Sequence, residues 1–202
     1  MIYRILTYHQ VMPGYLDFIS VFGQQIYSRD LRFSSFREQN LLSTTVLGLS
    51  MPSLGRSGRQ YQLCYNLKSV TCLSTATNDS KSQEWSIRQA ALHHQFDVVY
   101  GTTLWIITKG DLNLKDRVQE MTGKDGRPED RAFGTPEDCF KSSLAVHLLC
   151  CHWSTEAWRW YLQWLEDVID AEVSRVHHIL RECLRYGFTL TCSLIISHTL
   201  QC

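Results

Sequence analysis

A net charge is absent from this chain of 202 residues, because its 20 Lys and Arg side chains are balanced by 20 Asp and Glu. No long block of Lys or Arg occurs either. Neutralisation of phosphate groups supplies most of the affinity for nucleic acids, so binders of that class usually carry a basic excess. The sequence therefore predicts that nucleic acid is not a partner.

A long hydrophobic run is also missing. The most apolar stretch, residues 186–200, is interrupted by Thr, Ser and His198, whereas a membrane-spanning helix needs about 20 predominantly apolar residues. Residues 1–10 lack the apolar segment of a signal peptide. We therefore expect neither a membrane span in this chain nor secretion.

A Cys-x-x-Cys pair is missing, although the chain has eight cysteines, of which Cys150 and Cys151 are adjacent. A Cys-x-x-Cys pair would indicate a structural zinc site or a redox motif. Reduced thiols in the cytosol are the simplest interpretation. A chain of this length can bury roughly 70% of its unfolded surface, so its core needs neither disulfide nor metal. The sequence predicts a soluble, cytoplasmic protein.

A recognisable catalytic motif is absent as well. No Gly-x-Ser-x-Gly turn presents a nucleophilic serine. Cysteine and histidine are both common in the chain, so no particular Cys–His pair can be assigned as nucleophile and base. We predict that the protein is not an enzyme.

Alternating apolar and polar residues predict strands in the middle of the chain. Residues 61–68 alternate with period two and present one apolar face. Residues 85–99 form a second extended run, and residues 104–108 form a third that is rich in β-branched side chains. Gly101 marks the bend of a hairpin between the last two. We predict three antiparallel strands.

Capping signals predict helices in the C-terminal half. Asp111 is placed to cap a helix that ends at Gly123, and Thr135 followed by Pro136 is a strong helix start. Ser154 is predicted to cap the next helix. The helix after Thr135 carries a set of apolar residues on one face: Phe140, Leu144, Leu148 and Cys151. The prediction is an α+β fold with a small antiparallel sheet, several packed helices and a helical C-terminal part.

The segments before the first predicted strand give weaker signals. Residues 17–36 mix aromatic and basic side chains and are predicted to be irregular or weakly helical. Residues 41–58 carry Ser, Thr, Gly and Pro and are predicted to be a loop. After Glu172 the sequence shows no clear pattern.

Two short motifs resemble metal sites. His93 and His94 are adjacent on a predicted strand, so they point to opposite faces and are poorly placed to bind one ion. Cys150, Cys151 and His152 lack the second ligand pair that structural zinc requires. Structural or surface histidines and small buried thiols are the favoured interpretations.

Two loops carry charge. The segment 55–59, Gly-Arg-Ser-Gly-Arg, could cradle an anion, but it precedes a strand rather than a helix, so a mobile surface loop is favoured. The carboxylates of Asp125, Glu129 and Asp130 could bind a hard cation. Arginines are interspersed among them, which favours a solvated loop with local ion pairs.

Four tryptophans between residues 153 and 164 are the most unusual feature of the composition. Core packing explains Trp158 and Trp164, which share a helical face. Trp160 falls near another face, and exposed aromatic residues mark interfaces. Trp160 is therefore a candidate contact with a partner.

Several long strings resemble a known family. They include WSIRQAALHHQFD at residues 85–97, LWIITKG at 104–110 and GRPEDRAFGTPEDCF at 126–140. Further similar strings occupy residues 32–39, 54–65, 143–149 and 151–156. Together they are similar to the N-terminal cytosolic domain of fungal CorA-like transporter proteins.

The resemblance divides the chain into three parts. Residues 15–172 resemble the CorA-like domain, residues 1–14 form an uncertain N-terminal segment, and residues 173–202 form an atypical tail. The sequence contains no Gly-Met-Asn motif, which stands at the pore mouth of CorA-type proteins, and no pair of spanning helices. The tail is explained either by a translated intron in a truncated gene product or by a true short paralogue.

The resemblance implies a non-catalytic cytosolic domain with a regulatory or assembly role. In CorA-type proteins the cytosolic part senses divalent cations such as magnesium and the chain forms a homo-oligomer. No metal-ligating residue can be assigned to this chain, and no other cofactor is expected. The alternative is a standalone soluble protein-interaction domain without a role in ion transport.

Overall fold

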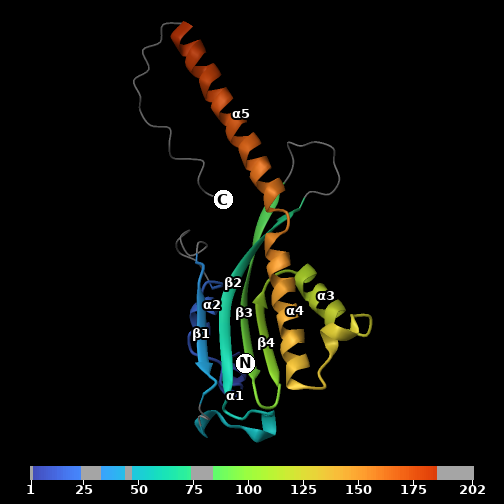
Figure 1. Cartoon of the computed structure of the whole chain (residues 1–202). Helices are drawn as coiled ribbons and strands as arrows, with labels where there is room; N and C mark the ends of the chain where they lie inside the picture. Colours follow the sequence, from blue (N-terminus) through green and yellow to red (C-terminus); the bar gives the residue numbers. More distant parts are fainter. Residues whose placement is uncertain (1, 24–32, 44–46, 74–83, 186–202) are drawn as a thin grey trace. The chain divides into compact units, whose positions relative to one another are not determined.

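The computed structural model describes residues 2–23, 33–43, 47–73 and 84–185. These residues contain a four-stranded antiparallel sheet in the order β1-β2-β3-β4 (Figure 1). The strands are β1 (Phe36–Leu41), β2 (Gln60–Cys72), β3 (Trp85–Asp97) and β4 (Thr103–Lys109). The predicted α+β class, the three predicted strands and their antiparallel pairing are confirmed. The apolar stretch 186–200 lies outside the described residues.

Strand β1 was missed by the sequence prediction because its residues do not alternate clearly. Its sequence, FREQNL, is mostly polar and mostly exposed. It pairs with the first half of β2, with Phe36 opposite Tyr65 and Leu41 opposite Gln60. A polar edge strand of this kind protects a sheet from pairing with other chains.

The hairpin between β3 and β4 turns at Gly101, as predicted. Gly101 has a φ of +71°, and a Cβ atom there would lie 2.8 Å from the Cα atom of Pro136. Both the left-handed backbone and the close approach of Pro136, the first residue of the helix Pro136–Thr155, therefore require glycine. The turn thus packs directly against the start of that helix.

Helices cover both faces of the sheet (Figure 1). Helix α1 (Ile2–Tyr8) and helix α2 (Tyr15–Ser20) pack on one face, and α3 (Leu112–Thr122) and α4 (Pro136–Thr155) pack on the other. Short 3-10 helices, η2 (Leu47–Leu49), η3 (Pro52–Leu54) and η5 (Pro128–Arg131), occur in the connections. The sheet is therefore the middle layer of three.

The predicted caps of α3 and α4 are confirmed. The Asp111 carboxylate accepts a hydrogen bond from the backbone N–H of Leu114 at 2.8 Å. The Thr135 hydroxyl accepts one from the backbone N–H of Asp138 at 3.2 Å. Each side chain satisfies a backbone donor that the first helical turn leaves without a partner.

The predicted cap at Ser154 is wrong. Ser154 lies inside α4, and its hydroxyl donates to the carbonyl of Cys151. The next helix, α5 (Trp158–Arg185), begins after Ala157, whose φ of +61° interrupts the helical path. Among the described residues, those up to Trp158 form one compact unit and those from Arg159 onward, which belong to α5, form a second.

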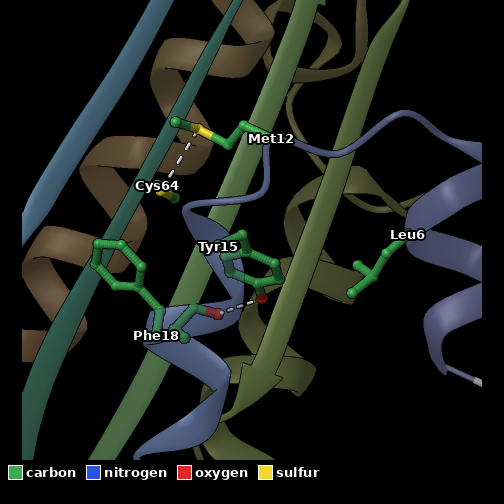
Figure 2. Packing of buried hydrophobic residues seen from close by; sticks show 6 residues of the cluster. Leu6, Met12, Tyr15, Phe18 and Cys64 are labelled. Atoms are coloured by element: carbon green, nitrogen blue, oxygen red, sulfur yellow. Dashed lines mark hydrogen bonds between the residues drawn. The ribbon is translucent and has the colours of Figure 1, made fainter.

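The first core lies between the sheet and the N-terminal helices. Figure 2 shows Tyr15 and Phe18 of α2 beside Met12 and Cys64, with Leu6 reaching in from α1. The Tyr15 hydroxyl donates to the backbone carbonyl of Ala91 at 3.2 Å. A buried tyrosine needs such a partner, so this contact fixes how α2 lies on β3.

The second core lies between the sheet and the C-terminal helices. It joins Leu92 of β3 and Leu114 of α3 to Val146, Cys150 and Trp153 of α4. The indole N–H of Trp153 donates to the Asp111 carboxylate at 3.0 Å. Asp111 therefore holds the start of α3 and the buried tryptophan of α4 at the same time.

On β2 the polar face is more deeply buried than the apolar face, which is the reverse of what the alternation of residues predicts. The apolar face that the alternation predicts, which includes Tyr61 and Tyr65, is only partly buried. The opposite face carries Gln60, Gln62 and Asn66 and is buried beneath the N-terminal segment. A strand covered on both sides can bury polar side chains when they are hydrogen-bonded. Because these side chains are polar, the hydropathy of the sequence does not reveal that this face is buried.

The apolar face predicted for α4 is likewise not the packed one. Phe140, Leu144 and Leu148 are exposed large hydrophobic residues. The buried face is made of small and polar side chains together with one large residue: Cys139, Ser142, Ser143, Val146, Cys150 and Trp153. Small side chains let α4 lie close to the sheet, where the bulky aromatic residues of β2 and β4 already fill the space.

Candidate functional site

The two adjacent histidines of β3 are both fully buried, on opposite faces of the sheet. The predicted divergence of His93 and His94 is confirmed. His93 faces the N-terminal helices, where its Nε2 lies 3.0 Å from the Gln62 side-chain oxygen. The same oxygen accepts from the backbone N–H of Met12 at 2.8 Å. An oxygen cannot donate, so Nε2 of His93 carries the proton.

His93 is held in its neutral form. Its Nδ1 atom has no hydrogen-bond partner in the described residues. Burial, with a smaller contribution from Arg56, lowers the pKa of His93 to about 4. The side chain therefore acts as a neutral connector between β3 and the amide of Gln62.

His94 starts a chain of hydrogen bonds between the sheet and α4. Its Nδ1 lies 2.9 Å from Nε2 of His147, whose Nδ1 lies 2.6 Å from the Tyr65 hydroxyl. On the other side, Nε2 of His94 lies 3.0 Å from the Thr103 hydroxyl, which lies 3.3 Å from the Ser143 hydroxyl. Five side chains from β2, β3, β4 and α4 thus form one connected row.

When both imidazoles are neutral, all hydrogen bonds of the row between Tyr65 and Thr103 are donated in the same direction along it. If the Tyr65 hydroxyl donates to His147, then His147 donates to His94 and His94 donates to Thr103; the reverse order is the other solution. Burial lowers the pKa of His94 to about 3, with His147 as a further cause, and burial lowers that of His147 to about 4. The Trp105 ring stacks on His94 at 4.2 Å, which excludes water from this layer.

Sequence reasoning did not find this row because its members are far apart in the chain. His94 and His147 are separated by 53 positions and Tyr65 and His147 by 82. The only usable signal was the presence of a histidine, His147, on the partly apolar helix α4. No periodicity of one element predicts which side chains of another element it meets.

The segment 55–59 differs from the predicted mobile surface loop. Arg56 is only 5% exposed, and its guanidinium donates to the backbone carbonyl of His9 at 2.6 Å. Ser57 donates from its backbone N–H to the Asp97 carboxylate at 2.6 Å. The segment is therefore packed against β3 and the end of α1.

The other candidate ligands are not brought together. Cys150 is buried, as predicted, whereas Cys151 is exposed. In the acidic segment the Arg127 guanidinium lies 3.8 Å from the Asp130 carboxylate, which agrees with local ion pairing. In the parts of the chain that the structure describes, no three His, Cys, Asp or Glu side chains meet in a metal-binding arrangement. These residues by themselves do not fit a resident metal ion.

The tryptophans have different environments. Trp153 is buried in the second core, and the Trp158 indole donates to the Ser154 carbonyl. Trp164 stacks with Tyr161 at 5.8 Å. Trp160, the predicted partner contact, is 61% exposed, with the Arg159 guanidinium 5.7 Å from its ring centre.

Helix α5 carries an apolar face along its whole length. Most of these side chains are exposed, and they recur at spacings of three, four and four residues: Leu162, Leu165, Ile169, Val173, Val176, Leu180 and Leu184. At 100° per residue these positions share one side of the helix. Trp160 lies on the opposite side. The helix also continues past Glu172 into the segment for which the sequence showed no clear pattern.

None of the described helices combines the length and the apolarity needed to cross a bilayer. The charged residues of α5 separate its apolar positions, so the face is a stripe and not a continuous apolar surface. A stripe of this kind is typical of a helix that packs against other protein helices.

Comparison with known protein families identifies a match over most of the chain. A family model described as CorA-like transporters covers residues 1–177. No curated protein and no solved structure matches the chain.

Proposed function

The chain belongs to the family of CorA-like transporters, and from this membership we propose that it acts as a non-catalytic, cytoplasmic regulatory and assembly domain. The observation that carries the proposal is the exposed apolar face of α5. Its assembly role would be to join copies of the chain through that helix. The regulatory role would be to make this association respond to divalent cations.

Self-association explains the α5 face better than exposure to water. The helix has 28 residues and is therefore about 42 Å long at 1.5 Å per residue. Exposed apolar side chains aligned over this length mark an interaction site. In a cyclic oligomer each copy presents the same surface, so one apolar stripe per chain is sufficient to build a closed helical bundle.

Glu172 supplies a link to cations. It immediately precedes Val173 and lies at the edge of the apolar face, and its described partner is Arg175 one turn further on. In a parallel bundle the Glu172 carboxylate of each copy would lie at the border with a neighbouring copy. Like charges at close range repel, and a divalent cation coordinated by carboxylate oxygens would relieve that repulsion.

Replacing Val176 with Glu is expected to dissociate the oligomer. A charge placed in the apolar face costs about 3 kcal/mol when it is buried without a partner, which is roughly a hundredfold in the association constant. Analytical ultracentrifugation of the full chain over a range of concentrations measures the change. His178→Glu, on the opposite side of α5, is the matched control and should associate as the wild type does. A wild-type chain that stays monomeric at high concentration would contradict the assembly role.

Millimolar magnesium is expected to raise the melting temperature of the wild-type chain but not that of Val176→Glu. The reason is that the proposed cation site exists only where copies meet. Glu172→Gln should associate more strongly than the wild type without magnesium and should lose the magnesium response. If magnesium neither binds in calorimetry nor stabilises the wild type, the alternative function, a standalone protein-interaction domain, is favoured.

Trp160 is a proposed contact for a different partner, because it lies away from the apolar face. Trp160→Ala is therefore expected to leave self-association unchanged. A change in sedimentation caused by Trp160→Ala would place this side chain in the self-association interface instead.

A further inference from the structure

A polar cavity of about 110 Å³ lies where the β3–β4 hairpin meets the segment after η3. Its polar wall is formed by His9, Arg56, Gln60, Gln95 and Asp97. Thr102, at the rim, is exposed. None of its lining residues belongs to α5, so the inference does not rest on the proposed function.

Arg56 brings a positive charge to this cavity without a direct counter-ion. Its guanidinium contacts His9 twice, at the backbone carbonyl and at Nδ1 of the ring. In the described residues no carboxylate oxygen lies within the 4.0 Å of an ion pair with it. A guanidinium has five N–H donors, so several remain for another acceptor. Buried charges are normally paired.

Asp97 attracts Arg56 electrostatically, which opposes the lowering of the Arg56 pKa by burial, but its carboxylate oxygens take their hydrogen bonds from other groups. It accepts from the backbone N–H and the hydroxyl of Ser57, and from the backbone N–H groups of Val99 and Tyr100. These four donors hold the hairpin turn against the segment 55–59. Asp97 therefore shapes the cavity wall, and the remaining N–H donors of Arg56 are not used by its carboxylate.

Two buried amides add unused hydrogen-bonding groups at the same place. The Gln95 side-chain N–H donates to the Gln60 side-chain oxygen at 2.6 Å. The Gln60 nitrogen and the Gln95 oxygen have no partner. Exchanging nitrogen and oxygen in both amides reverses the bond but still leaves one donor and one acceptor unpaired. A complementary ligand therefore has both an acceptor and a donor.

The volume of the cavity limits the number of atoms that a ligand can have. An apolar cavity of about 150 Å³ holds benzene, which has six carbon atoms. By proportion, about 110 Å³ holds roughly four or five non-hydrogen atoms. We propose that this cavity binds a small hydroxylated oxyanion, the class of bicarbonate and glycolate. Its charged oxygens face Arg56 and the Gln60 amide N–H, and its hydroxyl donates to the Gln95 carbonyl.

Thermal unfolding of the full chain tests the ligand class. Glycolate and bicarbonate, at equal ionic strength, should raise the melting temperature by about 5–10 °C at a hundred times their Kd. Acetate lacks the hydroxyl and ethylene glycol lacks the charge, so each should bind at least about tenfold more weakly than glycolate. The proposal is wrong if neither oxyanion shifts the melting temperature more than sodium chloride does, since the cavity then holds water alone.

Substitutions of the lining residues test whether glycolate binds in this cavity. Arg56→Met should abolish the glycolate shift, whereas Arg59→Met, at an exposed neighbour whose side chain donates to the Leu42 carbonyl, should keep it. Because Arg56 also holds His9, a second variant is needed in case the first does not fold. Gln60→Met combined with Gln95→Met removes both amides while preserving volume, so it should fold and lose the preference for glycolate over acetate. An unchanged preference in this double variant would overturn the proposed site.

Discussion

Lowering the pH from 7 to 5 is expected to reduce the free energy of unfolding by about 4 kcal/mol through the two buried histidines of β3 alone. The pKa of His93 is lowered to about 4 and that of His94 to about 3, both mainly by burial. In the unfolded chain an imidazole titrates near 6.5. Each histidine then contributes roughly 2 kcal/mol over this interval, at 1.36 kcal/mol per pKa unit.

The sign follows from proton uptake. Between about pH 6.5 and pH 4 the unfolded chain binds protons that the folded chain does not, so stability rises with pH in this window. The stabilisation is fully present above pH 6.5 and is lost as the pH falls toward the folded pKa values. His147, whose pKa is also lowered by burial, acts in the same direction.

Urea unfolding at pH 7, 6 and 5 measures this dependence. His93→Gln should reduce the slope of stability against pH by about one proton, because an amide replaces a titrating ring. His177→Gln, at an exposed histidine of α5, is the matched control and should leave the slope as it is. A free energy of unfolding that stays constant from pH 7 to pH 5 would show that the buried histidines are accessible to protons in the folded state.

Replacing Trp153 with Ala is expected to destabilise the first unit by about 4 kcal/mol. The side chain is buried between α4 and the sheet, and its loss leaves a large cavity in the second core. The same change removes the indole donor to Asp111, so the cap of α3 loses its lateral support. Chemical denaturation followed by circular dichroism measures the loss.

A graded series separates the two causes. Trp153→Phe keeps most of the ring but removes the N–H, so it should cost about 1–2 kcal/mol. Trp160→Ala, at the exposed tryptophan, should change stability by less than about 0.5 kcal/mol. If Trp153→Ala and Trp160→Ala lowered the free energy of unfolding equally, the burial of Trp153 would not be the source of its contribution to stability.

Local signals in the sequence predicted the elements around the second core well. Asp111 and Thr135 act within one helical turn, and the turn at Gly101 depends on one backbone angle, so each can be inferred from neighbouring residues. The resemblance to CorA-like transporters, stated from strings in the same region, is confirmed by the family match over residues 1–177. The regulatory role and Trp160 as a partner contact stay predictions.

The sequence prediction failed where polar residues are buried. Gln62 and His93 are joined by a hydrogen bond between the neighbouring strands β2 and β3. The polar face of β2 is therefore buried, while its apolar face is only partly buried. Arg56 was assigned to a surface loop because glycine and serine surround it. Its burial depends on contacts with His9, 47 positions away, which local composition cannot predict.

The spacing along α5 also determines how copies of the helix would wind around each other. Leu162, Val173 and Leu184 recur every eleven residues, which is 3.67 residues per turn, slightly more than the 3.6 of a straight α-helix. A seven-residue repeat would give a left-handed supercoil, whereas an eleven-residue repeat gives a slight right-handed one. A bundle built on this face would therefore have nearly straight helices with a weak right-handed twist.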